Sequence, residues 1–118
     1  MERLIKAFEN SVRAFNRLRR SEKAVQQELV LLLAALPVGW FLAATWRGYA
    51  LLIGAVLLVL LIEVLNTGIE AACDAFSREF NTDIQLAKDC GSLAVLISIL
   101  MAAGIWALAI MERFWGVS

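Results

Sequence analysis

The chain has 118 residues, of which 61% are hydrophobic, and its 11 Lys and Arg residues balance 11 Asp and Glu residues. A soluble domain is typically about 45–50% apolar, so this composition, with a mean hydropathy of +0.74, favours one membrane domain and argues against a nucleic-acid partner. Histidine is absent, which removes the commonest general base and metal ligand, and Cys73 and Cys90 form no CxxC motif that would suggest a disulfide framework.

The N-terminal segment, residues 1–27, has the period of an amphipathic helix. Its apolar residues fall on one face, whereas its Lys and Arg residues lie elsewhere; the apolar set is Leu4, Ile5, Phe8, Val12 and Phe15. This pattern predicts a helix that lies along the inner membrane interface. A basic anchor that only fixes the topology of the chain explains the periodicity equally well.

Three apolar segments follow, in the regions 28–46, 49–76 and 85–112. A membrane-spanning helix needs about 20 residues, so the second segment qualifies only if its helix continues past Ile62. Arg47 and Gly48 leave a very short connection, which predicts an antiparallel hairpin of the first two spans. The predicted fold is an all-α membrane protein of one domain, residues 1–118, with three transmembrane helices and an N-terminal interfacial helix.

The basic residues are distributed unevenly about these spans. Residues 1–28 hold seven of them and the connection before the third span adds Arg78 and Lys88, whereas the opposite side holds only Arg47 and Arg113. The positive-inside rule therefore predicts a cytoplasmic N-terminus and a C-terminus on the outer side.

The second span ends in a polar stripe. Glu63, Asn66, Glu70 and Asp74 are spaced i, i+3, i+7 and i+11, which places them on one narrow face at about 100° per residue. Glu63 falls short of the inner edge of a hydrocarbon core about 30 Å thick, where an acid is costly unless it is protonated, paired or facing a polar pocket. A helix end that reaches the headgroups explains Asp74 but not Glu63, so the stripe favours a functional pocket.

Two more polar clusters are expected at the same membrane face. Lys88 and Asp89 precede the third apolar run, and Glu22 and Glu28 precede the first. Taken singly, each is explained by a snorkelling lysine, an acid at a helix start or a solvated helix end. Together, carboxylates and a lysine suit Mg²⁺ and phosphate oxygens, and a deeper carboxylate could take a proton from a lipid hydroxyl. No GxxxxGK[ST] or GxGxxG motif is present, so no soluble kinase fold is indicated.

Four segments resemble the small integral-membrane diacylglycerol kinases of bacteria, a family that includes undecaprenol kinases. They are RLIKAF, EKAVQQE, EVLNTGIEAACD and LAKDCGSLAVLI, of which EVLNTGIE closely resembles the pattern E-x-x-N-[ST]-[AG]-I-E. The resemblance covers nearly the whole chain. It implies an ATP-dependent kinase of the bacterial inner membrane with a periplasmic C-terminus, and a homotrimer whose sites are shared between protomers. A small-residue stripe, Ala94, Ser98 and Ala102, is compatible with close helix packing.

The resemblance also implies roles for individual residues. Glu63 would be the general base for the lipid hydroxyl, and Glu22 and Glu70 would bind Mg²⁺. The ATP-binding residues would be Arg3, Ser11, Glu22, Glu70, Glu79, Lys88 and Asp89, with Lys88 at the phosphates. The lipid substrate would contact Arg3, Glu63, Asn66, Ser92 and Trp106.

The predicted reaction is phosphoryl transfer from ATP to 1,2-diacylglycerol, giving phosphatidic acid and ADP. The Gly91-Ser92 pair resembles diacylglycerol kinases, whereas undecaprenol kinases more often have alanines there, so undecaprenol is the alternative lipid. Asn10 and Ala75 depart from the family pattern and leave the nucleobase preference open. A small proton-coupled transporter, which would place its acid near the midplane, and an accessory scaffold are alternatives of other classes.

Overall fold

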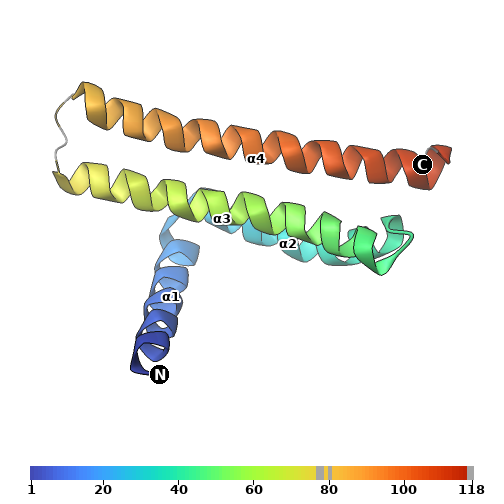
Figure 1. The fold of residues 1–118 in the computed structure, drawn as a ribbon, viewed down its shortest axis with the longest axis horizontal. Helices are drawn as coiled ribbons and strands as arrows, with labels where there is room; N and C mark the ends of the chain where they lie inside the picture. Colours follow the sequence, from blue (N-terminus) through green and yellow to red (C-terminus); the bar gives the residue numbers. More distant parts are fainter. Residues whose placement is uncertain (77–78, 80, 117–118) are drawn as a thin grey trace.

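The computed structural model describes residues 1–76, 79 and 81–116, and four α-helices make up nearly all of this part (Figure 1). They are α1 (Glu2–Ser21), α2 (Lys23–Leu42), α3 (Trp46–Phe76) and α4 (Thr82–Trp115). No strand occurs among the described residues, so the predicted all-α class is confirmed. Arg78, which contributes to the charge asymmetry of the sequence, lies outside the described residues.

Helices α2, α3 and α4 are each long and apolar enough to cross a membrane. With 20, 31 and 34 residues, they are about 30, 46 and 51 Å long at 1.5 Å per residue. Helix α3 packs against both α4 and α2, whereas α2 hardly contacts α4. The core of the chain therefore follows α3, where Leu52, Ala55 and Val59 are buried.

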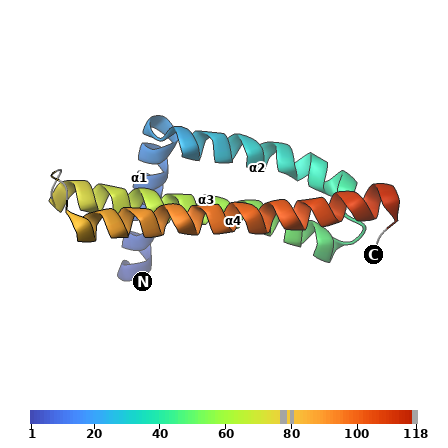
Figure 2. The ribbon, with the colours of Figure 1, turned by 90° about the horizontal axis from the view of Figure 1, so that it is seen from above.

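The connection between α2 and α3 differs from the prediction. It is formed by residues 43–45, while Arg47 and Gly48 lie in the first turn of α3. Thr45 explains this start, because its Oγ1 accepts a hydrogen bond from the Gly48 amide at 3.0 Å and its carbonyl accepts one from the Tyr49 amide at 3.0 Å. A threonine hydroxyl here satisfies a donor that a helix start otherwise leaves unpaired. The two helices run antiparallel, as expected (Figure 2).

Aromatic side chains gather where α2 meets α3, at what we call the aromatic end. Trp40, Trp46 and Tyr49 contact one another edge to face, with ring centroids 4.8, 5.5 and 6.3 Å apart. The Arg113 guanidinium lies 4.5 Å from the centre of the Phe41 ring, and its Nε donates to the Phe41 carbonyl at 3.2 Å. Arg113 thus ties the end of α4 to the end of α2. Clustered aromatic rings of this kind are typical of a membrane interface.

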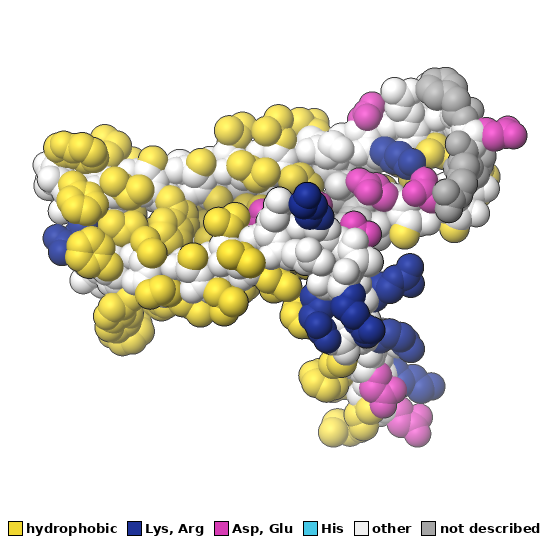
Figure 3. All heavy atoms as spheres, turned by 180° about the vertical axis from the view of Figure 1, so that it is seen from behind, with side chains coloured by type: hydrophobic (Ala, Val, Ile, Leu, Met, Phe, Trp, Pro, Cys, Tyr) yellow, Lys and Arg dark blue, Asp and Glu magenta, His cyan; other side chains and the backbone are white. Residues whose placement is uncertain are grey.

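Helix α1 projects from the bundle where α2 begins and lies across the direction of the other helices (Figure 1). None of its residues, all of which are described, is buried. Figure 3 shows its hydrophobic side chains on one side and its charged side chains on the other. This arrangement suits a helix that lies in the plane of the membrane which the bundle crosses.

Helices α3 and α4 extend together beyond the start of α2, away from the aromatic end (Figures 1 and 2). We call this extension, residues 67–76 and 82–91, the α3–α4 arm. Asn81 begins α4, because its Oδ1 accepts hydrogen bonds from the amides of Asp83 and Ile84 at 2.9 and 3.2 Å. Charged side chains gather on the arm and on α1, whereas hydrophobic ones cover the rest of the bundle (Figure 3).

Candidate active site

Glu63 on α3 lies among three other glutamates. Its charge is repelled by those of Glu70 and Glu22, and the charge of Glu28 is in turn repelled by Glu63. Glu22 is the single residue that joins α1 to α2. The structure thus places the predicted general base near both predicted metal ligands and adds Glu28. We call these four side chains the acidic cluster.

Asn66 is the buried member of the polar stripe. It is 8% exposed, and its Nδ2 donates a hydrogen bond to Oε1 of Glu70 at 3.1 Å. Its Oδ1 is buried and has no hydrogen-bond partner among the described residues. The hydroxyl of the next residue, Thr67, donates to the Glu63 carbonyl at 2.9 Å, so this bond does not involve the Glu63 carboxylate. Asn66 therefore holds Glu70 from inside the bundle.

Lys88 and Asp74 form an ion pair across the α3–α4 arm. Lys88 Nζ lies 2.8 Å from Asp74 Oδ1, and both side chains are about half exposed. The charge of Glu70 also acts on Lys88, so the lysine lies within electrostatic reach of the acidic cluster. No partner for Asp74 was predicted from the sequence. The position of Asp74 at the end of the polar stripe could have indicated a site role, since Asp74 shares a helix face with Glu63 and Glu70.

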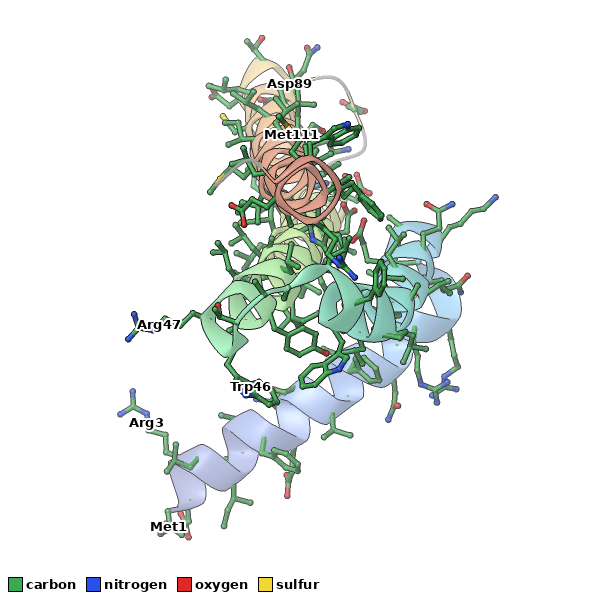
Figure 4. The ribbon with its side chains drawn as sticks, turned by 90° about the vertical axis from the view of Figure 1, so that its right-hand side faces the viewer. Met1, Arg3, Trp46, Arg47, Asp89 and Met111 are labelled. Carbon is green, nitrogen blue, oxygen red and sulfur yellow. The ribbon has the colours of Figure 1, made fainter. Side chains whose placement is uncertain are left out.

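Four predicted site residues do not join the acidic cluster within the protomer. Arg3 and Ser11 are exposed on α1, where the Ser11 hydroxyl donates to the Ala7 carbonyl of its own helix at 2.8 Å. Asp89 and Ser92 are exposed on α4. Viewed along the bundle, Arg3 and Asp89 lie on opposite sides of the molecule (Figure 4). One protomer thus presents the predicted nucleotide contacts on two separate surfaces.

Glu79 and Trp106 also lie apart from Glu63. Glu79 is exposed in the connection between α3 and α4. Trp106 donates its Nε1 hydrogen bond to the Leu52 carbonyl at 3.1 Å. Leu52 precedes Asn66 by 14 residues of the same helix, which is about 21 Å. Trp106 is therefore much nearer the aromatic end than the lipid contacts predicted beside it.

A groove of about 510 Å³ runs between α2, α3 and α4 from Glu28 to Trp106. Glu28 is its one charged lining residue, and the wall between the two ends is made of aliphatic side chains, among them Leu31, Val59 and Ile99. An elongated apolar groove that ends at a carboxylate suits a molecule with a hydrocarbon chain and a polar head.

The acidic cluster offers carboxylate oxygens, the ligand type that Mg²⁺ takes when substrate phosphates supply its other ligands. Within residues 1–76, 79 and 81–116, no group of three or more His, Cys, Asp or Glu side chains could hold a metal ion. Glu22 and Glu70 are the two members of the acidic cluster that the family resemblance assigns to a metal ion, and the described residues do not form a metal site by themselves.

These features define a multi-pass, all-helical membrane protein with a carboxylate-rich site beside an apolar groove. A sequence profile described as prokaryotic diacylglycerol kinase matches residues 9–110. The chain is 36% identical over 112 residues to a diacylglycerol kinase of Escherichia coli K12, and this alignment covers 95% of the present chain and 92% of that relative. A diacylglycerol kinase of Pseudomonas aeruginosa is 33% identical over 107 residues, which are 91% of this chain and 87% of that relative. A diacylglycerol kinase of Haemophilus influenzae is 30% identical over 103 residues, which are 87% of each chain.

The chain belongs to the prokaryotic diacylglycerol kinase family. The resemblance drawn from the four sequence segments is confirmed, and with it the interpretation of the chain as a membrane-embedded lipid kinase. The transporter and scaffold alternatives are set aside, because the relatives are enzymes over nearly the whole length of the chain.

Proposed function

We propose that the protein transfers the γ-phosphoryl group of ATP to the hydroxyl of 1,2-diacylglycerol and releases phosphatidic acid and ADP, with Mg²⁺ as cofactor. The observation that carries this proposal is the acidic cluster at the end of an apolar groove, where Glu63 lies near both Glu22 and Glu70. The choice of diacylglycerol follows the relatives, which are named for that substrate.

The groove supports the lipid side of the reaction. Its aliphatic wall would hold an acyl chain, while its Glu28 end would bring the lipid hydroxyl toward Glu63. Glu63 then accepts the proton of that hydroxyl as the oxygen bonds to the γ-phosphorus and the bond to the ADP oxygen breaks. The Glu63 carboxylate would lie at the edge of the hydrocarbon and near other carboxylates, which is where such a proton would leave.

The nucleotide side rests on Glu22, Glu70 and Lys88. Glu22 and Glu70 would hold the Mg²⁺, which neutralises charge on the phosphate oxygens of the bound nucleotide. Asn66 keeps the Glu70 carboxylate in place through its hydrogen bond. Lys88 would offer its ammonium group to the phosphates, and Asp74 would keep that group over the arm until the nucleotide binds.

We propose that the working unit is a homotrimer in which neighbouring protomers complete each site. Arg3 on α1 and Asp89 on α4 lie on opposite sides of the molecule, so one chain would not bring both predicted ATP contacts to one nucleotide without a rearrangement. The small-residue stripe does not supply the surface between copies, because Ser98 is only 2% exposed inside the protomer.

We propose that the acidic cluster lies on the cytoplasmic side of the bacterial inner membrane. The charge asymmetry supports this orientation, since α1 and the start of α2 are rich in Lys and Arg, whereas the aromatic end carries only Arg47 and Arg113. A nucleotide of the cytoplasm would then reach the site directly, and the C-terminus would be periplasmic.

The test is transfer of radiolabelled phosphate from ATP by the purified full-length protein in detergent micelles. Diacylglycerol and undecaprenol are offered in parallel, each with Mg²⁺ and with a chelator. We expect labelled phosphatidic acid that requires Mg²⁺ and exceeds any labelled undecaprenyl phosphate. The opposite ratio would assign undecaprenol as the substrate, and transfer to neither lipid would refute the proposed reaction.

A further inference from the structure

Helix α4 comes unusually close to α3 at Gly91. A β-carbon built on Gly91 would overlap Oδ1 of Asn66 and would lie 3.1 Å from its Cγ. The corresponding β-carbon on Gly104, in the same helix, meets nothing within 4 Å. A glycine inside a helix is less favourable than an alanine, so a close contact is a physical reason for glycine at position 91 that does not exist at position 104.

This contact fixes how the Asn66 amide lies. Its Oδ1 occupies the space that a side chain at position 91 would fill, and its Nδ2 points the other way, to Oε1 of Glu70 at 3.1 Å. This orientation suits the bond, because Nδ2 carries the only hydrogen-bond donors of the amide and the Glu70 carboxyl oxygen accepts. Asn66 is 92% buried, so it has little room to turn.

Within the described part of the chain the amide oxygen of Asn66 is unpaired, so the bond from its nitrogen to Glu70 is the polar contact that this side chain makes. Oδ1 is buried without a hydrogen-bond partner among the described residues, which is unfavourable for a polar atom. The Gly91 backbone next to it offers at most a weak C–H contact. In this arrangement the amide oxygen of Asn66 stays unpaired within that part of the chain, while the amide nitrogen bonds to Glu70.

We propose that Gly91 is a positioning residue of the phosphoryl-transfer site: by lacking a side chain it lets Asn66 reach the place from which it holds the Glu70 carboxylate. This inference rests on the proposed function, in which Glu70 binds the metal ion. A methyl group at position 91 pushes the Asn66 amide toward α3 and removes the bond to Glu70, so the metal ligand loses its orientation.

A glycine that only permits two helices to pack would behave differently. In that case a methyl group would lower the thermal stability of the protein but would leave the metal requirement of the folded fraction unchanged. The two roles are therefore separated by a metal titration, and not by the loss of activity alone.

The experiment compares Gly91→Ala with Gly104→Ala in the full-length protein in micelles. Changes around a metal ligand typically cost about 10–100-fold in metal affinity or activity, so we expect Gly91→Ala to raise the half-maximal Mg²⁺ concentration by about tenfold and to lower kcat. Mg·ATP should also raise the unfolding temperature of Gly91→Ala less than that of the unsubstituted protein. Gly104→Ala should match the unsubstituted protein in all of these measurements.

A stability cycle tests the contact without relying on turnover. We expect the Gly91→Ala, Asn66→Ala double variant to lose less unfolding temperature than the sum of the single variants, because removing the amide makes room for the methyl group. Additive losses, or a Mg²⁺ titration of Gly91→Ala that superimposes on that of the unsubstituted protein, would overturn the proposal. An unsubstituted protein that phosphorylates neither lipid refutes the proposed function, whereas the stability cycle still decides whether Gly91 makes room for Asn66.

Discussion

Glu63→Gln is the most informative single substitution in this protein. Glutamine keeps the size of the side chain and its capacity for hydrogen bonds, but it cannot accept the proton of a lipid hydroxyl. A positioned general base typically contributes about 10²–10⁴-fold to the rate, which corresponds to about 3–5 kcal/mol of the activation free energy at 1.36 kcal/mol per tenfold. We therefore expect kcat to fall by that factor.

The surroundings of Glu63 predict that folding and nucleotide binding survive the change. The substitution removes a negative charge that Glu22 and Glu70 repel, so it relieves repulsion and should not lower the unfolding temperature. Both proposed metal ligands remain, and the Thr67 hydroxyl bonds to the carbonyl of residue 63 and not to its side chain. The KM for Mg·ATP should therefore stay within about twofold.

The assay measures phosphoryl transfer from labelled ATP to diacylglycerol in micelles, and Mg·ATP binding is followed in parallel by its effect on the unfolding temperature. Glu112→Gln is the matched control, because Glu112 is exposed near the C-terminus of α4, far from the acidic cluster. A variant that keeps its kcat would remove Glu63 as the base. A loss of kcat that merely follows the loss of bound nucleotide would point to a role in binding.

Five further substitutions test other contacts. Glu22→Ala and Glu70→Ala should each raise the Mg²⁺ concentration needed for half-maximal rate, and an unchanged titration would show that the metal ion binds elsewhere. Asp74→Asn should lower the free energy of unfolding by only about 0.2–1 kcal/mol, as for other half-exposed ion pairs; a much larger loss in thermal unfolding would mean that the pair is shielded from water by another part of the assembly. Thr45→Ala should cost about 1 kcal/mol of stability through the lost helix cap with unchanged kcat, while Thr45→Ser should be nearly neutral, and equal stability of the two variants would show that the hydroxyl is not a cap.

The helices were predictable where one pattern dominated. The spacing of Glu63, Asn66 and Glu70 makes a coherent face only in a helix, so the continuation of α3 through this stretch followed from the sequence. The turn between α2 and α3 was placed wrongly, because Arg47 and Gly48 are the residues that separate the two apolar runs of the sequence. The start of α3 is set instead by Thr45, whose hydroxyl accepts a hydrogen bond from the Gly48 amide.

The sequence could predict which site residues lie at the same membrane face, because that depends only on their positions along their own helices. Glu63 adjoins the second apolar run and Glu22 lies shortly before the first, both at the same predicted membrane face, so their proximity could be expected. The pairing of Lys88 with Asp74 depends on the register of α4 against α3, which hydrophobic periodicity does not specify.

Two of the predicted lipid contacts lie far apart along α4. Ser92 and Trp106 are 14 residues apart in α4, which is about 21 Å in a helix. Helical rise alone therefore separates two contacts that the family resemblance assigned to the same lipid.

The unequal lengths of the helices bear on the order in which substrates bind. Helix α2, with 20 residues, matches a hydrocarbon core about 30 Å thick, whereas α3 and α4 continue together past its start as a projecting pair (Figure 1). The groove opens along the part that α2 flanks, and Lys88 lies on the projecting part. A nucleotide and a lipid would thus approach different stretches of the same two helices without obstructing each other. Initial-rate kinetics should accordingly fit a random sequential scheme, in which neither ligand is required before the other.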